Sequence, residues 1–238
     1  MKNEIILIPI GILQSDLKQR YETPRQGILA KGSSAIITLY AKNNFNQALK
    51  DIDGFDRLWI IYQFHLNKNW KPLVTPPRHT KNKVGVFATR APFRPNPIGL
   101  SCVKLEKVEC LKIFISKSDI LDGSPILDIK PYLPYSDSFP GSATGWVKNE
   151  SGNIYEIVIE EKVKIFADKI KKEEGINLSG YAQVQLEFNP TDVTRKRISK
   201  VDENENEKGL YVLAYQKHKI RYRVNEFEKR VYIVNIMS

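Results

Sequence analysis

The stretch VGVFATRAPFRPNPIGLSCVKLEKVECLKIFISKSDI, residues 84–120, decides the fold class. It contains three short runs rich in Val, Ile, Leu and Phe, at residues 84–89, 99–108 and 111–120. Runs of this length and composition, bounded by Gly, Pro, Asn and Asp, predict β-strands. The stretch therefore predicts consecutive strands with no helix between them.

The rest of the first half continues in the same way. Further strands are predicted at residues 4–12, 35–40 and 58–66, and residues 45–52 are the only clear helical segment. Many short strands with few helices are typical of a barrel or sandwich, whereas strands alternating with helices would indicate a doubly wound sheet. We therefore predict a β-barrel that is not of the Rossmann type.

The segment PYLPYSDSFPGSATGW, residues 131–146, is dense in Pro, Gly and Ser and is expected to lead out of the first domain. We therefore predict a mainly β protein with some α structure, in two domains. The first is an N-terminal β-barrel at residues 1–146, and the second is a small α+β domain at residues 150–238.

The second half has a different pattern. Apolar residues at helical spacing predict a helix at residues 160–174, and a second helix is expected at 179–188. Residues 194–208 are highly charged and predict a loop. A three-stranded meander is predicted from the segments 210–215, 219–224 and 230–236.

The charge of the chain is concentrated in the first half. The formal net charge is +10, from 37 basic and 27 acidic residues. Residues 1–149 carry 21 basic and 12 acidic side chains, whereas residues 150–238 carry 16 and 15. No Asp or Glu occurs from Arg57 to Leu105. A basic, acid-free segment attracts polyanions, so nucleic acid is the expected partner, with a solvated surface as the alternative.

Composition excludes several other classes. Hydrophobic residues make up 42% and charged residues 27%, as in soluble globular proteins, and no apolar run approaches the ~20 residues of a membrane span. The two cysteines, Cys102 and Cys110, lie in an alternating apolar stretch and are expected to be buried thiols. The three histidines show no ligand spacing, so no metal is expected. A cytoplasmic protein without membrane contact fits best.

The loop inside the opening stretch is rigid and carries cations. Three prolines fix φ and restrict the residue before each of them; they are Pro92, Pro95 and Pro97. The loop thereby holds three polar side chains in set directions, those of Arg90, Arg94 and Asn96. Rigid presentation of guanidinium groups suits the positioning of a ligand, although stiff proline-rich connections also occur where no ligand binds.

Two further segments have the same polar character. Thr23-Pro-Arg-Gln-Gly27 is a short turn that carries a guanidinium and an amide. Asp122-Gly-Ser-Pro125 is a tight turn within an apolar context. Turns that contain Asp-Gly mostly close ordinary hairpins, so neither segment alone defines a site.

Together these segments resemble the TsaA-like (TrmO) family of tRNA methyltransferases. The matching stretches are TPRQG (23–27), GFDRLWIIYQFH (54–65), GVFATRAPFRPNPIGLS (85–101) and DILDGSPILDIKPYLPYSDS (119–138). The second half, which ends in YVLAYQKHKIRYRVN, is more loosely similar to the small C-terminal domain of that family.

The resemblance implies a β-barrel that binds S-adenosylmethionine, usually as a homodimer. It implies methylation of N6 of threonylcarbamoyladenosine at position 37 of tRNA, next to the anticodon. The absence of a G-x-G-x-x-G motif agrees with a cofactor site that is not of the Rossmann type.

The resemblance also implies a set of cofactor-binding residues. They are Pro24, Arg25, Gln26, Phe64, His65, Arg90, Leu100, Asp122, Gly123, Ser124 and Pro125. These residue types suit the cofactor, because its adenine needs an apolar wall and its ribose and amino-acid portions need charged or polar partners. For His65 the alternative is a hydrogen-bonded core histidine at the end of a strand.

The reaction would be an in-line transfer of a methyl group from sulfur to nitrogen. Its main demand is alignment of the reacting atoms. A general base would add ~10²–10⁴-fold. The candidates are His65, Asp128 and Tyr132, and the sequence does not choose among them or exclude positioning without a base.

Candidates for contact with tRNA come from both halves. They are Arg78, Lys81, Arg94, Asn96, Arg195, Arg197, Arg221 and Arg223. Guanidinium forks suit a phosphate or the threonyl carboxylate. Arg221 and Arg223 alternate with Tyr222 and so share one face of a strand, where a solvated face is the alternative.

The chain departs from the family pattern at two places. His79-Thr-Lys-Asn-Lys83 stands where the family commonly has a glycine-containing turn. Asn189-Pro-Thr-Asp192 stands where the C-terminal domain usually has Asp-Pro-Arg-Pro, and the arginines are displaced to Arg195 and Arg197.

Two other functions remain open at this point. One is a non-catalytic RNA-binding barrel that uses the same basic face with stacked aromatic rings. The other is a barrel that binds a small molecule and whose positive charge is incidental.

Overall fold

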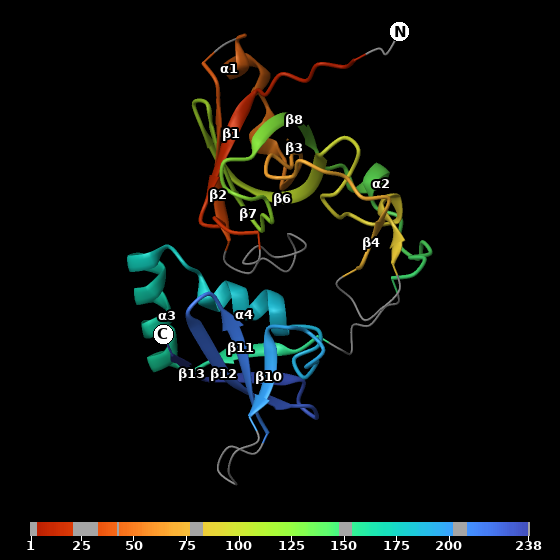
Figure 1. Ribbon diagram of the computed structural model, residues 1–238. Coiled ribbons are helices and arrows are strands. Elements are labelled where there is room, and N and C mark those ends of the chain that lie inside the picture. The colour runs from red at the N-terminus through yellow and green to blue at the C-terminus, as the bar shows by residue number, and fades with distance from the viewer. Residues whose placement is uncertain are drawn as a thin grey trace. The chain divides into compact units, whose positions relative to one another are not determined.

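The computed structural model describes residues 4–20, 33–41, 43–76, 83–147, 154–201 and 209–237 (Figure 1). By contacts within the chain, it divides into two compact units, Met1–Ser142 and Ala143–Ser238. The first unit contains the three described stretches that carry the family resemblance, and each unit has a hydrophobic core of its own.

The first unit is a closed six-stranded barrel. Its strands, in the order in which they pair around the barrel, are β1 (Gly11–Ser15), β2 (Ser34–Leu39), β7 (Lys112–Ser116), β6 (Ile98–Glu109), β3 (Arg57–Gln63) and β8 (Pro125–Pro131). Every neighbouring pair is antiparallel. The predicted mainly β fold with an N-terminal barrel is confirmed.

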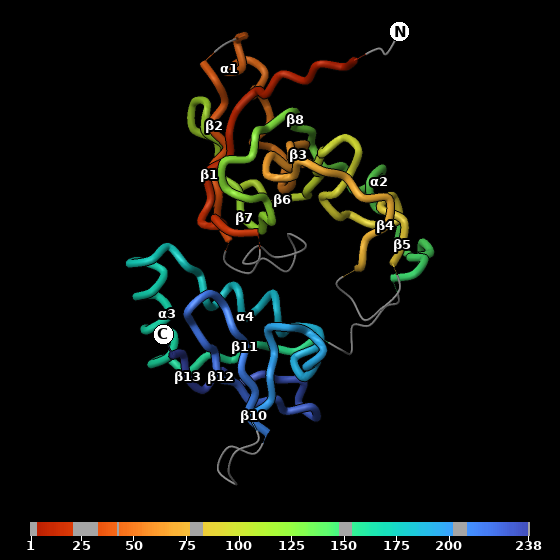
Figure 2. The backbone as a smooth tube through the Cα atoms, viewed as in Figure 1, coloured from red at the N-terminus to blue at the C-terminus, as the bar shows by residue number. Residues whose placement is uncertain are grey.

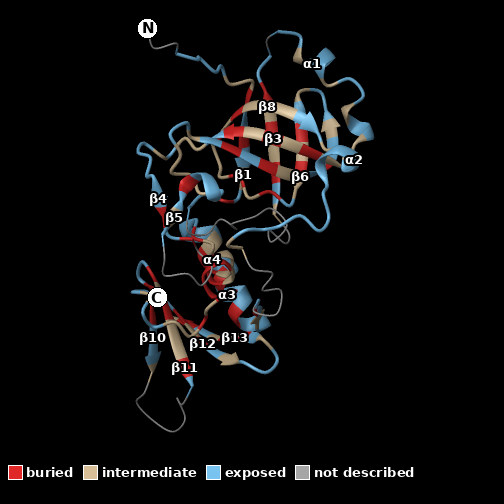
Figure 3. Ribbon diagram, turned by 90° about the vertical axis from the view of Figure 1, so that its right-hand side faces the viewer, coloured by how far each residue is buried: buried red, intermediate tan, exposed pale blue. Residues whose placement is uncertain are grey.

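Alternation of side chains along the strands explains the barrel. Leu58, Ile60 and Tyr62 of β3 are buried, and the residues between them are only half-buried (Figure 3). The longest strand, β6, begins with the same alternation and buries Gly99 and Ser101. Because successive side chains of a strand point to opposite faces, one row from each strand fills the barrel and the other faces outward.

Short elements connect the strands. They are the helices α1 (Phe45–Ala48) and α2 (Pro134–Asp137) and the 3-10 turns η2 (Ile52–Gly54) and η3 (Val86–Ala88). Strands β4 (Leu73–Val74) and β5 (Val84–Gly85) form a separate two-stranded sheet beside the barrel (Figure 2).

Strand β8 was not predicted, and three other predictions for this unit were wrong in detail. The strand predicted at 84–89 ends at Gly85, because the Thr89 hydroxyl donates to the Val86 carbonyl at 2.8 Å and closes a turn there. The first strand spans 11–15 and not 4–12. Neither cysteine is fully buried: Cys102 is half-buried, and Cys110 is exposed, since it occupies the tight turn between β6 and β7 with a φ of 52°.

The second unit is a five-stranded sheet with two helices. In pairing order its strands are β10 (Ile198–Val201), β11 (Leu210–Tyr215), β12 (His218–Asn225), β13 (Arg230–Met237) and β9 (Glu156–Ile159). The helices are α3 (Glu161–Glu174) and α4 (Leu178–Leu186). The meander was predicted, but β9 and β10 were missed, and β10 lies in part of the segment 194–208 that was predicted to be a loop.

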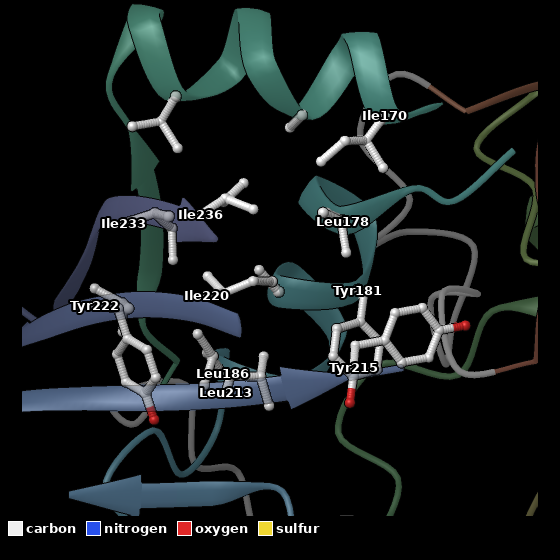
Figure 4. Packing of buried hydrophobic residues seen from close by; sticks show 14 of the residues in the cluster. Ile170, Leu178, Tyr181, Leu186, Leu213, Tyr215, Ile220, Tyr222, Ile233 and Ile236 are labelled. Atoms are coloured by element: carbon white, nitrogen blue, oxygen red, sulfur yellow. The ribbon is translucent and has the colours of Figure 1, made fainter. Parts of the chain in front are cut away.

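The helices cover one face of this sheet. Figure 4 shows Ile170 of α3 above the strand residues Ile220 and Ile233, and Leu178 of α4 belongs to the same cluster. The rings of Tyr181 and Tyr215 stack with their centroids 4.0 Å apart. Helix α3 ends at Glu174 and is capped by Gly175, whose φ of 71° is the left-handed conformation that glycine adopts without strain.

Candidate functional site

The strand register brings the candidate residues of the barrel to one end of it. Strand β3 ends at Gln63, which pairs with Ile98 at the start of β6. Strand β8 starts at Pro125, which pairs with Ile12 of β1. The segments 64–65 and 122–124 and the start of β6 therefore meet at the same end of the barrel, which we call the site end. Pro24, Arg25 and Gln26 lie outside the described residues.

The turn before β8 is fixed to the end of β1 by its backbone. Gly123 N–H donates to the Leu13 carbonyl at 2.9 Å, and Leu13 N–H donates to the Ser124 carbonyl at 3.0 Å. Asp122 N–H donates to the Leu17 carbonyl at 2.9 Å. Gly123 has a φ of 72°, which L side chains rarely adopt. The sequence Asp-Gly thus serves a turn that joins two barrel strands and not a simple hairpin.

The Asp122 carboxylate is held by two donors. Oδ1 accepts from the Ser15 N–H at 2.8 Å, and Oδ2 lies 2.6 Å from Lys18 Nζ. Partial burial alone would raise the pKa of Asp122, but the hydrogen bonds from Lys18 and Ser15 outweigh it, and the pKa is lowered. Asp122 is therefore an anion at neutral pH. Ser15 and Lys18 were missed by sequence reasoning, since nothing local links them to a residue more than a hundred positions away.

His65 lies against this turn. Its Nδ1 is 3.4 Å from the hydroxyl of Ser124, which is itself buried. Burial lowers the pKa of His65 and the Arg20 charge lowers it further, which outweighs the opposite effects of the Gln63 carbonyl and Asp122. The imidazole is therefore neutral at neutral pH and can accept or donate a proton. A Cβ at Gly123 would lie 3.8 Å from His65 Nε2, so only a narrow gap separates the turn from the ring.

Phe64 and Leu100 supply apolar surface at this end. The Phe64 N–H donates to the Pro97 carbonyl at 2.7 Å, and the Phe64 ring meets the Tyr62 ring edge-on at 5.2 Å. Leu100 is 54% exposed and lies on the outer face of β6, opposite Ile61. Phe64 packs against the barrel core, whereas Leu100 faces outward, so each offers separate apolar surface of the kind that an adenine ring requires.

A buried polar network supports the wall from inside the barrel. Ser101 Oγ donates to Asp119 Oδ1 at 2.6 Å and lies 3.4 Å from the Tyr62 hydroxyl. Burial and the Asp119 charge raise the pKa of Tyr62, so its phenol stays protonated. Sequence reasoning missed this network, because Ser101 and Tyr62 occupy positions whose alternation only indicated an apolar core.

The three candidate general bases are not brought together. Asp128 lies opposite Ile61 on the outer face of the barrel, and Leu100 lies opposite Ile61 on the neighbouring strand β6. The Asp128 carboxylate forms an ion pair with Lys130 at 2.9 Å. The backbone of Tyr132 pairs with Arg57 at the start of β3.

The position of Tyr132 is at the far end of the barrel. Strand β3 runs from Arg57 to Gln63, which at about 3.3 Å per residue separates its two ends by about 20 Å. Within one chain, only His65 of the three lies beside the Asp122 turn.

The proline-rich loop uses its two arginines differently. Arg94 is half-buried, and its Nη1 donates to the carbonyls of Val86 at 3.2 Å and Thr89 at 2.9 Å. Arg90 is exposed and has no hydrogen bond or ion pair with any other residue that the structure describes. Arg94 therefore stabilises the loop, whereas Arg90 is available to a ligand. Asn96 is exposed as well.

The four arginines of the second unit that are candidates for contact with tRNA also fall into two groups. Arg195 donates to the backbone and side chain of Gln185, and Arg197 donates to the Tyr181 hydroxyl at 3.3 Å. Both contacts lie within the unit. Arg223 is exposed and Arg221 half-buried.

These two arginines point away from the helices, because Tyr222 between them is buried in the core. Arg78 and Lys81 lie outside the described residues.

Two classes of site were also sought in the described part of the chain. No group of three or more His, Cys, Asp or Glu side chains there is arranged to hold a metal ion. None of the helices found in those ranges has the length and apolar character needed to cross a membrane.

The fold and the site together define the class of protein. It is a closed β-barrel that carries a fixed anionic turn, a neutral histidine and a basic loop at one end. Residues 12–138 match the family model described as the tRNA-methyltransferase O N-terminal domain. This match covers more than half of the chain, so the chain belongs to that family.

Individual relatives agree with this assignment. The chain is 40% identical over 147 residues to the tRNA (adenine(37)-N6)-methyltransferase of Escherichia coli, a match of 59% of this chain and 63% of the relative. It is 42% identical over 140 residues to a Pyrococcus abyssi protein named "Probable S-adenosyl-L-methionine-binding protein", a match of 59% of this chain and 74% of the relative. The match thus spans less than two thirds of the Escherichia coli protein.

The similarity of fold extends further than the similarity of sequence. The crystal structure of TrmO from Pseudomonas aeruginosa superimposes with a TM-score of 0.65 at 23% identity, over 99% of this chain and 100% of the other. At this identity the likeness concerns the fold alone, and it includes the second unit.

Proposed function

We propose that this chain uses S-adenosylmethionine to methylate N6 of threonylcarbamoyladenosine at position 37 of tRNA, by in-line transfer. The main support for the proposal is that Phe64, His65 and the Asp122–Ser124 turn lie at the same end of the barrel. All of these residues lie within the family match at residues 12–138. The names of the Escherichia coli and Pyrococcus abyssi relatives support the methyl acceptor and the cofactor.

The residues present at the site end fit this cofactor. The Asp122 carboxylate can accept hydrogen bonds from ribose hydroxyls, and the exposed Arg90 guanidinium can pair with a carboxylate. Phe64 and Leu100 offer an apolar wall for adenine. Gly123 leaves a gap beside His65 that a Cβ would narrow. Pro24, Arg25, Gln26, Ser124 and Pro125 complete the proposed binding set.

When bound, S-adenosylmethionine supplies a methyl group on a positively charged sulfur. The protein's task is to hold the acceptor nitrogen in line with the carbon–sulfur bond, which is a proximity effect. The N6–H proton must leave as the nitrogen–carbon bond forms. We assign its removal to His65 and, as part of the proposal, the tautomer in which Nδ1–H donates to Ser124 Oγ, because Nε2 of that neutral imidazole can accept a proton.

The tRNA would approach the site end. Lys18, Arg20, Lys68 and Lys71 all lie on segments that leave the barrel there, in addition to the loop arginines. Such a cluster attracts the phosphates of an anticodon stem-loop. Asn96, Arg221 and Arg223 remain candidates for contact, and so do Arg94, Arg195 and Arg197, although the last three already make contacts within their own units. We assign cofactor binding and catalysis to the first unit and assistance in tRNA binding to the second.

We also propose a homodimer in the cytoplasm. Residues 5–8 form an extended segment whose apolar side chains face solvent, with Ile5 87%, Ile6 84%, Leu7 53% and Ile8 78% exposed. In a dimer, this segment of one copy would pack against the surface of the other copy and be buried there. Ile6→Lys should then lower the sedimenting mass of the full chain, and an unchanged mass would exclude the segment from the interface.

The decisive experiment is transfer of a tritiated methyl group from S-adenosylmethionine to tRNA that carries threonylcarbamoyladenosine but lacks the methyl group. Transfer should occur, and tRNA without the threonylcarbamoyl group should accept much less. If the chain binds this tRNA but transfers no methyl group, it is a non-catalytic RNA-binding barrel. His65→Asn tests the proton acceptor, with Asp128→Asn as the matched control on the barrel wall.

A further inference from the structure

A segment beside the site combines exposed aromatic rings with positive charge. We call residues 64–76 and 83–97 the basic lobe. They contain no Asp or Glu and carry five cations, Lys68, Lys71, Lys83, Arg90 and Arg94. Large apolar side chains are nevertheless exposed on the lobe: Trp70 is 52% exposed, Leu73 52% and Phe87 75%. Exposed rings beside cations need an explanation, because contiguous exposed apolar surface usually marks a site of interaction.

The lobe holds these rings on a fixed backbone. The Lys71 N–H donates to the Phe93 carbonyl and the Val86 N–H donates to the Pro72 carbonyl, both at 3.0 Å. The segment that carries Trp70 is therefore tied to the segment that carries Phe87.

Cations flank the rings of the lobe. The Arg94 guanidinium lies 5.7 Å from the centroid of the Phe87 ring, and Lys71 Nζ lies 5.1 Å from that of Phe93. Positive charge and aromatic faces are thus combined at the same positions, which is how proteins bind unpaired bases.

The lobe is continuous with the site. The Asn67 amide donates to the Pro92 carbonyl at 3.0 Å, and the Phe64 N–H donates to the Pro97 carbonyl at 2.7 Å. Phe64 precedes His65, so a nucleotide on the lobe would be a near neighbour of a base that is held against His65.

We propose that Trp70 and Phe87 stack against unpaired loop bases that flank the target nucleoside of the RNA, while Lys68, Lys71 and Arg90 contact the phosphates between them. The proposal rests on the proposed function for the identity of the target. Proteins recognise single-stranded RNA loops by splaying out bases and stacking them on aromatic side chains or guanidinium planes.

Charge favours RNA over a second copy of the chain as the occupant of the lobe. A two-fold interface places the same patch of both subunits together. Two basic lobes would then bring ten cations together with no carboxylate from either lobe to offset them. An RNA loop supplies phosphates for the cations and bases for the rings.

The test measures binding of an anticodon stem-loop that carries 2-aminopurine beside the target position, whose fluorescence falls when it stacks. The full chain is compared with Trp70→Leu, Phe87→Leu and Trp70→Phe. Leucine keeps apolar surface without a π face, and phenylalanine keeps the π face. Tyr135→Leu is the matched control, because Tyr135 is an exposed aromatic residue that lies beyond the end of β8, at the opposite end of the barrel.

Trp70→Leu and Phe87→Leu should each weaken binding of the stem-loop at least about fivefold and relieve the quenching. Trp70→Phe and the Tyr135 control should bind like the parent chain. Affinity for S-adenosylmethionine and the unfolding midpoint should not change in any variant. Parent-like binding by both leucine variants would overturn the proposal, and so would a change in sedimentation without a change in RNA affinity.

The outcome also separates this proposal from the proposed function. If the parent chain binds the stem-loop through Trp70 and Phe87 but transfers no methyl group, the stacking surface stands and the enzyme assignment fails. If methyl transfer occurs and is insensitive to both leucine variants, the enzyme assignment stands and the stacking surface fails. If the parent chain does not bind the stem-loop, both fail.

Discussion

Gly99→Ala tests the packing that supports the apolar wall of the site. A Cβ at Gly99 would lie 2.4 Å from Cζ of Tyr62 and 2.7 Å from both of its Cε atoms. Ordinary carbon contacts are 3.5–4.0 Å, so the ring would have to move by about 1 Å. Tyr62 is only 6% exposed and its ring contacts that of Phe64 at 5.2 Å. The ring therefore has no free space to move into.

Overpacking of this kind costs about 1–3 kcal/mol. We expect the unfolding midpoint of the first unit to fall accordingly in urea, monitored by fluorescence of Trp59 and Trp70. Because a displaced Tyr62 also displaces Phe64, affinity for S-adenosylmethionine should fall as well. Gly85→Ala is the matched control, since a Cβ there meets nothing within 4 Å.

A double mutant completes the test. Tyr62→Leu removes the clashing ring, so adding Gly99→Ala to it should cost much less than Gly99→Ala costs alone. Equal midpoints for Gly99→Ala and Gly85→Ala would refute the reasoning, because the ring could not then lie against the glycine.

Three further predictions follow from the contacts of single side chains. Arg94→Ala should lower the free energy of unfolding by about 1–3 kcal/mol, because the variant loses two hydrogen bonds to carbonyl groups. Arg90→Ala should leave the free energy of unfolding unchanged but weaken cofactor or tRNA use. Equal losses of this free energy in the two variants, measured by urea unfolding, would contradict the prediction. The pKa of Asp122 is lowered in the fold. The contribution of its carboxylate to the free energy of unfolding should therefore be complete above about pH 4 and disappear as the pH falls further. The stability difference between the parent and Asp122→Asn should therefore shrink between pH 6 and pH 3. Methyl transfer should decline as the pH falls through the lowered pKa of His65, and an identical pH–rate profile in His65→Asn would remove His65 as the base.

Local sequence pattern predicted four of the six barrel strands, β2, β3, β6 and β7, because alternation is a property of consecutive residues; it misplaced β1 and missed β8. It did not predict which strands pair. Strand β1 closes the barrel against β8, and Ser15 meets Asp122 across 107 positions of sequence. The contact between His65 and Ser124 spans 59 positions. The resemblance assigned Asp122, His65 and Ser124 to one site but not Ser15, and the geometry of their contacts follows only from the closure of the barrel.

The case of Tyr132 shows why nearness in sequence misleads in a β protein. Tyr132 follows the Asp122 turn by ten residues, which suggested that both serve one site. Strand β8 occupies Pro125–Pro131 and crosses the barrel from one end to the other. A residue just after it must therefore emerge at the opposite end. In a helix of the same length the displacement would be less than half as large, because the rise per residue is about 1.5 Å and not about 3.3 Å.

The same geometry gives the barrel a charge polarity along its axis. The loops at the end opposite the site carry five carboxylates, those of Asp51, Asp53, Asp56, Glu109 and Asp137. Cations also lie at that end, and Lys107 pairs with Glu109 there. The segments that leave the site end carry a larger excess of cations, and the carboxylate of Asp122 there is already paired with Lys18. A phosphate backbone is thus attracted more strongly to the site end of the barrel than to the other, before any contact forms. Under the proposed function, RNA would need no recognised sequence to approach the barrel in the right orientation, so selection of the nucleoside would be left to the basic lobe and the site end.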